Sequence, residues 1–159
     1  MTFQSILFPD NIIEDGGLRK QNLKKDISVS KPLISVITVV LNGEEFLEES
    51  IKSLHSQKHN NFEHIIIDGG SKDKTVEIIK KYNSKIEYWC QVNDKGIYDA
   101  FNLGMKLARG QYIGFLNSDD IYTPTAFQLL NNYIKKNPDI DFIFGSVKKH
   151  WGVLHGYKP

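Results

Sequence analysis

The sequence predicts an α/β domain whose mostly parallel sheet carries helices on both faces. Runs of β-branched and aliphatic residues alternate along the chain with segments whose apolar residues recur every three or four positions, which is the pattern of strands alternating with helices. The first run, residues 33–40, is apolar at nearly every position, as in a strand buried on both faces of a parallel sheet. Strictly alternating βαβα elements favour right-handed crossovers and a sheet covered on both sides.

Length and composition indicate one globular domain. The 159 residues are enough to bury a core without disulfides or a structural metal. A net charge of +1 supplies no overall field for nucleic acid, so we expect no nucleic-acid partner. The single cysteine, Cys90, lies in an apolar run and is typical of a buried thiol in a reducing cytoplasm. No apolar stretch approaches the roughly 20 residues of a spanning helix, and no signal-peptide pattern is present, so we expect a soluble, cytoplasmic protein.

The first 31 residues and the rest of the chain have different patterns. Residues 1–31 show no sustained period of either kind, and we interpret them as an N-terminal extension. The domain proper is predicted to cover residues 32–159. After its first strand, Leu47, Ile51 and Leu54 fall on a single helical stripe opposite charged residues, which predicts a helix.

The same alternation continues toward the C-terminus. Ser71 or Asp73 can cap the second predicted helix. The third has an apolar face running from Ile97 to Ala108. Thr123-Pro124 is expected to open the fourth, with the threonine as cap and the proline in the first turn. Strands are predicted at 62–67, 86–92, 112–116 and 141–147, and helices at 75–82, 97–108 and 123–136.

Polar residues follow each of the first four predicted strands. Ligands of open parallel sheets bind at the carboxyl ends of the strands. Because these ends lie along one edge of the sheet, the polar groups that follow them are expected to gather there. The candidates are Asn42 with Gly43, Asp68 to Ser71, Asp94 to Gly96, and Asp119 with Asp120.

The segment 117–120 places two adjacent carboxylates, Asp119 and Asp120, directly after an aliphatic strand. Like charges held together are unfavourable unless a divalent cation or hydrogen-bond donors compensate them. The pattern therefore favours a metal site that would bind a diphosphate. Asn-Ser-Asp-Asp is also ordinary turn and capping chemistry, and that interpretation stays open.

The segment 68–73 combines an acid, two glycines and a hydroxyl after the second strand. Asp68 could accept a hydrogen bond from a base N–H or a ribose hydroxyl, although a tight βα turn requires the same residue types. The chain has neither a G-x-G-x-x-G fingerprint nor a phosphate-binding G-x-x-x-x-G-K-[ST] loop, which disfavours those two nucleotide-binding classes.

Four segments taken in order resemble family 2 glycosyltransferases. The match runs from about Leu33 to Val147, and the Asp-Lys-Gly-Ile-Tyr-Asp-Ala stretch is typical of the branch that builds bacterial cell-surface polysaccharides. The order of the segments is more specific than any one of them. They are residues 34–42, 67–75, 94–104 and 114–120.

The resemblance implies a GT-A (Rossmann-like) fold and an inverting transfer of sugar from a nucleoside-diphosphate-sugar donor to a glycan or lipid-linked acceptor. It also implies Mn²⁺ or Mg²⁺ held by Asp119 and Asp120, and it places Gly104 with Asn102 in a helix facing the donor. The donor is expected to contact Val39, Asn42, Asp68, Gly70, Ser71, Asp94, Tyr98, Asn102 and Asp119.

The chain departs from the family pattern in three respects. Many relatives have an acid where this chain has Gly69, and an aspartate where it has Asn117, which affects base recognition and the first metal ligand. The family's general base and acceptor-binding half normally follow this stretch, so we expect the base beyond Pro159 and a domain that is incomplete at its C-terminus. His150 and His155 are the remaining candidates for a base, and both also fit surface histidines.

Three functional hypotheses remain. The first is a glycosyltransferase donor-binding domain, with peripheral membrane association at the inner face of the cytoplasmic membrane if the acceptor is lipid-linked. The second is a nucleotide-sugar-binding fragment without turnover, because it would lack the base. The third, a phosphoacceptor signalling domain, fits poorly because the first strand ends in Leu41-Asn42-Gly43 rather than in acids.

Overall fold

A computed structural model describes residues 11–21, 34–59, 61–93 and 96–145. Within these ranges the chain forms five strands, four α-helices and one short 3₁₀ helix. In chain order they are β1 (Ile12–Gly16), η2 (Leu18–Gln21), β2 (Ile34–Val40), α1 (Leu47–His55), β3 (Phe62–Asp68), α2 (Thr75–Lys81), β4 (Tyr88–Val92), α3 (Ile97–Leu107), β5 (Tyr112–Phe115) and α4 (Ala126–Lys136).

The strands form one sheet in the order β1-β4-β3-β2-β5. Strands β2, β3, β4 and β5 are parallel, and β1 pairs antiparallel with β4 at the edge. In this register Val40 at the end of β2 lies opposite Asp68 at the end of β3, and Ile37 lies opposite Phe115 of β5. The mostly parallel α/β sheet predicted from the sequence is confirmed.

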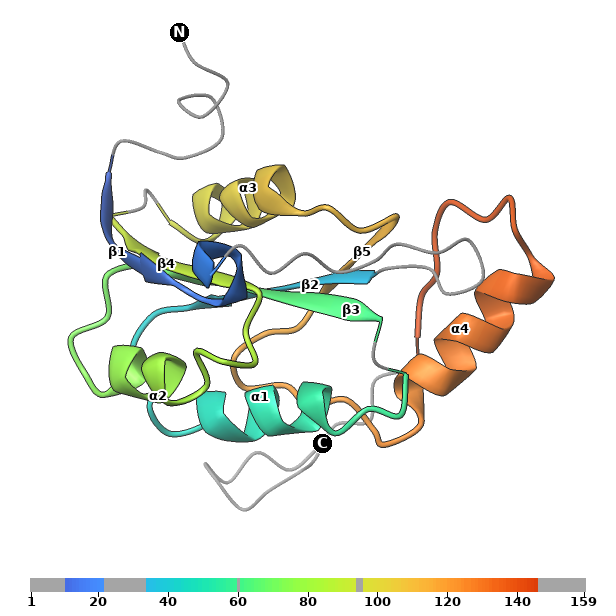
Figure 1. Ribbon diagram of the computed structural model, residues 1–159, viewed down its shortest axis with the longest axis horizontal. Helices are drawn as coiled ribbons and strands as arrows, with labels where there is room; N and C mark the ends of the chain where they lie inside the picture. The colour runs from blue at the N-terminus through green and yellow to red at the C-terminus, as the bar shows by residue number, and fades with distance from the viewer. Residues whose placement is uncertain (1–10, 22–33, 60, 94–95, 146–159) are drawn as a thin grey trace, which may run out of the picture.

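Helices cover both faces of the sheet. Figure 1 shows α3 above the sheet and α1 with α2 below it. Alternate residues of β2 point to opposite faces. Ile37 and Val39 join the apolar cluster beneath α3, while Val40 packs with residues of α1 and α2. A third cluster contains Phe127 of α4. Cys90 is buried, as predicted. No helix in the described part of the chain has the length and apolar character needed to cross a bilayer.

Part of the predicted N-terminal extension belongs to the sheet. Strand β1 and the 3₁₀ helix η2 both lie within the predicted extension. The amides of Leu18 and Arg19 in η2 donate to the carbonyls of Ile86 and Glu87, just before β4. The Arg19 guanidinium is buried, 2.8 Å from Glu63 and 3.7 Å from Glu87. The sequence showed no strand period here because the five residues of β1 do not alternate; they become a strand by pairing with the edge of β4.

The predicted last strand is wrong over residues 141–145. These residues form no strand, and Phe142 and Phe144 are 79% and 92% exposed. A strand requires a partner backbone, and no described strand pairs with this segment. Residues 146 and 147 lie outside the described residues.

Two local details of the helices also differ from prediction. Helix α4 begins at Ala126 rather than at Thr123-Pro124, and no threonine side chain caps it. Its early amide at Phe127 instead donates to the side chain of Gln57, which lies far away in the sequence. Ile97, predicted to lie on the apolar face of α3, is 55% exposed at the first turn.

Candidate binding site at the carboxyl edge of the sheet

The turn after β3 is built around a buried carboxylate. Asp68 has no exposed surface, and both of its oxygens lie 3.0 Å from the Ser71 amide, which donates to them. Burial raises the pKa of Asp68, and hydrogen bonds from Ser71 and Gln91 oppose this rise without cancelling it. Gly70 adopts a φ of +93°, a left-handed conformation that favours glycine. In this structure Asp68 supports the turn from inside the protein.

The loops after β2 and β3 are joined by hydrogen bonds between side chains and backbone. The Asn42 amide donates to Ser71 Oγ, and the Lys72 amide donates to Asn42 Oδ1, both at 2.8 Å. The Gly43 amide donates to Thr75 Oγ1, also at 2.8 Å. Asn42 itself has a φ of +52°. The two loops therefore hold one another in place, and both Asn42 and Ser71 take part in this fixation.

The acidic turn after β5 lies beside the loop that follows β2. A Cβ atom at Gly43 would lie 3.6 Å from Ser118 Oγ and 2.6 Å from a methyl group of Val40. Gly43 is therefore required by close packing, and it brings the β2–α1 loop into contact with the turn. Asp68 and the acids that follow β5 accordingly lie on the same edge of the sheet, as predicted from the parallel order of the strands.

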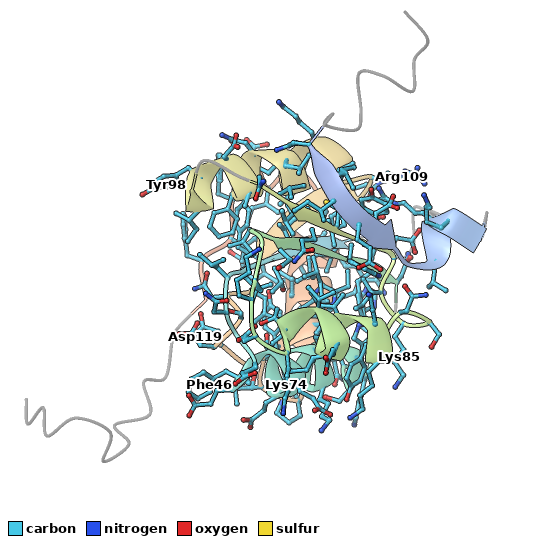
Figure 2. The ribbon with its side chains drawn as sticks, turned by 90° about the vertical axis from the view of Figure 1, so that its left-hand side faces the viewer. Phe46, Lys74, Lys85, Tyr98, Arg109 and Asp119 are labelled. Atoms are coloured by element: carbon cyan, nitrogen blue, oxygen red, sulfur yellow. The ribbon has the colours of Figure 1, made fainter. Side chains whose placement is uncertain are left out.

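Asn117 orients the acidic turn. The Asn117 side-chain Nδ2 donates to Asp120 Oδ2 at 2.8 Å. The main-chain carbonyl of Asn117 accepts a hydrogen bond from the main-chain amide of Asp120 at 3.1 Å. An aspartate at position 117 would place a third negative charge there instead of this donor. Asp119 and Asp120 are both exposed, and Figure 2 shows Asp119 at the margin of the molecule, on the same side as Tyr98 and Phe46.

The two acids have the chemistry of a magnesium or manganese site, although they do not complete one. Among the residues that the structure describes, no group of three histidine, cysteine or acidic side chains is close enough to hold a metal ion. Mg²⁺ is usually bound by one or two carboxylates together with substrate phosphates and water. Asp119 and Asp120 fit that donor set. His150 and His155 lie outside the described residues.

Helix α3 has exposed polar side chains on one face and buried packing residues on another. Tyr98 is 81% exposed and Asn102 is also exposed. Gly104, by contrast, is a packing residue, because a Cβ atom there would clash with a methyl group of Ile37. The side chain of Val39 lies in the core beneath this helix, so only its backbone can reach a ligand. Asp94 lies outside the described residues.

Sequence reasoning missed the residues of α1 that support the acidic turn. Ser50 is buried and its hydroxyl donates to the carbonyl of Asn117 at 3.2 Å. Ser53 and Gln57, further along the same face, contact the segment that follows the turn. The available signal was the presence of small or uncharged polar residues beside the apolar stripe of an amphipathic helix.

Comparisons with known proteins agree with this architecture. A family model described as "Glycosyl transferase family 2" matches residues 35–159. An uncharacterized glycosyltransferase of Rickettsia typhi is 38% identical over 112 residues, covering 70% of this chain and 35% of the relative. One of Methanocaldococcus jannaschii is 34% identical over 139 residues, covering 82% of this chain and 48% of the relative. The chain thus spans less than half the length of these relatives.

Solved structures show the same fold. The crystal structure of S. aureus TarS 1-349 in complex with UDP-GlcNAc superposes with a TM-score of 0.61 and 27% identity, covering 66% of this chain and 32% of that one. A mannosyltransferase of Pyrobaculum calidifontis, solved in complex with GDP-Man and Mn²⁺, has a TM-score of 0.55 at 18% identity, covering 73% of this chain and 36% of that one. At that identity the second likeness concerns the fold alone.

Proposed function

The chain belongs to glycosyl transferase family 2, and on that premise we propose that it binds the donor in a transfer of sugar from a nucleoside diphosphate to a glycan or lipid-linked acceptor. The observation that carries this proposal is the meeting of three loops at one edge of the sheet, two of them joined by hydrogen bonds and the third carrying two exposed acids. TarS, a structural neighbour with the same fold, was crystallised with UDP-GlcNAc and with UDP.

The loops after β2 and β3 would hold the nucleoside. Asn42, Gly70 and Ser71 form the walls of this part of the site, and Asp68 keeps the turn in shape from beneath. Because the Asp68 side chain is buried, we propose that it acts on the base by positioning the turn. Tyr98 in the first turn of α3 and Asn102 in its middle are exposed, and we propose that they contact the donor from that helix.

The acidic turn would hold the diphosphate through a divalent cation. Asp119 and Asp120 are the proposed ligands of Mn²⁺ or Mg²⁺, which when bound supplies Lewis-acid stabilisation of the negative charge on the leaving diphosphate. Asn117 fixes the orientation of the Asp120 carboxylate. In an inverting transfer an acceptor hydroxyl attacks the anomeric carbon, and a general base takes its proton. We place that base outside the described residues.

We also propose that the protein acts in surface polysaccharide assembly in the cytoplasm, at the inner face of the membrane if its acceptor is lipid-linked. The basic pairs at 24–25 and 148–149, which would contact anionic lipid, lie outside the described residues.

The phosphoacceptor hypothesis is not retained, because Asp68, its candidate acceptor, has no exposed surface.

Titration with UDP and GDP, with and without Mn²⁺, tests the proposal. We expect Mn²⁺ to strengthen binding to the wild-type chain, and Asp119→Ala or Asp120→Ala to abolish that increase. Asp139→Ala removes an exposed acid beyond α4 and is the matched control. If both variants retain the Mn²⁺-dependent increase, the metal assignment is wrong. Binding without sugar transfer would favour the alternative of a nucleotide-sugar-binding fragment that lacks the base.

A further inference from the structure

Three polar side chains on one face of α1 and its C-terminal extension contact the segment that contains the acidic turn. They are Ser50, Ser53 and Gln57, which are spaced three and four residues apart and so share a face of the helix. We call these three residues the α1 brace. We propose that the α1 brace sets the orientation of Asp119 and Asp120 and thereby determines how strongly a divalent cation increases affinity for a nucleoside diphosphate. This inference rests on the proposed function.

The brace contacts the segment on the N-terminal side of the acids and again just after them. Ser50 Oγ donates to the carbonyl of Asn117 at 3.2 Å. The amide of Tyr122 donates to Ser53 Oγ at 3.0 Å, and that hydroxyl donates in turn to the Ser50 carbonyl at 2.8 Å. The two acids therefore lie between two points that are fixed to the same helix.

Gln57 fixes the segment further along. Its side chain is 6% exposed. Nε2 donates to the carbonyl of Thr123 at 2.9 Å and to that of Ser53 at 3.0 Å, while Oε1 accepts the amide of Phe127 at 3.1 Å. With both donor hydrogens and the acceptor in use, the amide has one orientation. The Gln57 side chain joins the start of α4 to α1. It accepts a hydrogen bond from an early amide of α4, which no side chain at the N-cap of α4 does.

The same helix is also tied to the nucleoside side of the site. The loop that leads into α1 donates from Gly43 to Thr75 and from Glu44 to Asp73, both in the β3–α2 segment. Helix α1 is thus the element that holds the nucleoside loops and the acidic turn in one geometry. Residues that orient metal ligands typically change metal affinity 10- to 100-fold when removed, although they touch neither metal nor substrate.

The test compares Ser53→Ala and Gln57→Leu with Ser56→Ala. Ser56 is exposed, and its hydroxyl donates to a carbonyl of its own helix, so it is the matched control. UDP and GDP are titrated with and without Mn²⁺. We expect about a tenfold loss of the Mn²⁺-dependent increase in affinity in the brace variants, little change without metal, and no loss in the control. Ser53→Thr keeps the hydroxyl and should restore the increase.

Two further measurements separate positioning from general destabilisation. In an Asp119→Ala background the brace substitutions should cause no additional loss, because that variant is already expected to lack the Mn²⁺-dependent increase in affinity. Amide hydrogen exchange should become faster at Tyr122 and Phe127 in Ser53→Ala and Gln57→Leu, and stay unchanged in β2 and β3. If Gln57→Leu does not fold, Ser53→Ala carries the test.

The outcomes are distinct for the two claims. Full retention of the Mn²⁺-dependent increase in the brace variants, when Asp119→Ala loses it, overturns the brace and leaves the proposed function intact. If the wild-type chain shows no Mn²⁺-dependent binding at all, the proposed function fails and so does the brace's role in metal-dependent affinity. Amide hydrogen exchange then tests whether the α1 brace holds the segment around the acidic turn. Unchanged exchange rates at Tyr122 and Phe127 in the brace variants would overturn that role.

Discussion

Replacing Arg19 tests whether the N-terminal segment is an integral part of the domain. Its guanidinium lies 2.8 Å from Glu63 and 3.7 Å from Glu87, and all three side chains are at most 7% exposed. In Arg19→Met the apolar stem is kept while the cation is lost, so two carboxylates remain buried without it. Breaking a buried ion pair by removing one partner costs about 3–5 kcal/mol.

The structure places the expected cost at the lower end of that range. Glu63 retains hydrogen bonds from Ser35 Oγ and from the Arg109 amide, and the longer contact to Glu87 contributes less than the short one. We therefore expect a loss of about 3 kcal/mol in the free energy of unfolding. For a domain of this size that corresponds to a fall in Tm of roughly 6–12 °C.

Urea denaturation and thermal unfolding measure this loss. Lys20→Met is the matched control, because its ion pair with Asp15 is more than half exposed on the lysine side and should contribute under about 1 kcal/mol. Arg19→Met combined with Glu63→Gln and Glu87→Gln should recover much of the stability, since the two buried negative charges that Arg19 compensated are then also removed. A loss below about 1 kcal/mol in Arg19→Met alone would refute the reasoning.

Three other predictions concern the stability of the fold at Gly104, Asp73 and Asp68. Gly104→Ala places a Cβ atom in steric conflict with a methyl group of Ile37 and should reduce the free energy of unfolding by about 1–3 kcal/mol in urea titrations. Asp73→Ala removes the acceptor for the Thr75 amide at the start of α2 and should cost about 0.5–2 kcal/mol, with faster amide exchange at Thr75. Burial raises the pKa of Asp68, so folded protein holds the proton more tightly than unfolded protein, and stability is lost as pH rises through the window above the ordinary pKa. Asp68→Asn should therefore gain stability relative to wild type as the pH rises above about 4, and a difference in the free energy of unfolding that stays constant with pH would contradict the pKa shift.

Much of the fold could be predicted from the sequence because its elements carry their own periodicity. Strand β2 is apolar at five of its seven positions and buried at all seven, and α1 shows a clear apolar stripe. The failures share a cause. Strand β1 exists through pairing with β4, whereas residues 141–145 have strand-like composition and no described partner. Composition does not reveal whether a partner backbone is present.

The site was predictable in position but not in detail. Parallel order places the ends of β2, β3 and β5 on one edge, and this brings Asp68 and the acidic turn together. That Asp68 faces inward depends on the turn it closes with Ser71, which composition does not determine. Gln57 and Phe127 are 70 residues apart, so no local pattern indicates that one caps the helix of the other.

The central claim is that a cation bound at Asp119 and Asp120 lies beside the joined loops after β2 and β3. Broadening of amide NMR signals by Mn²⁺ in the presence of UDP or GDP tests it most directly. We predict loss of signal at Gly43, Gly70 and Ser118 in the wild-type chain, no loss at these positions in Asp119→Ala, and sharp signals in both at Arg109, which Figure 2 shows on the side opposite Asp119. Broadening centred instead on the groove beside α1 and α2, whose lining includes Glu44, Glu45, Glu48 and Glu77 together with Lys74 and Lys81, and unchanged in the variant, would contradict the account.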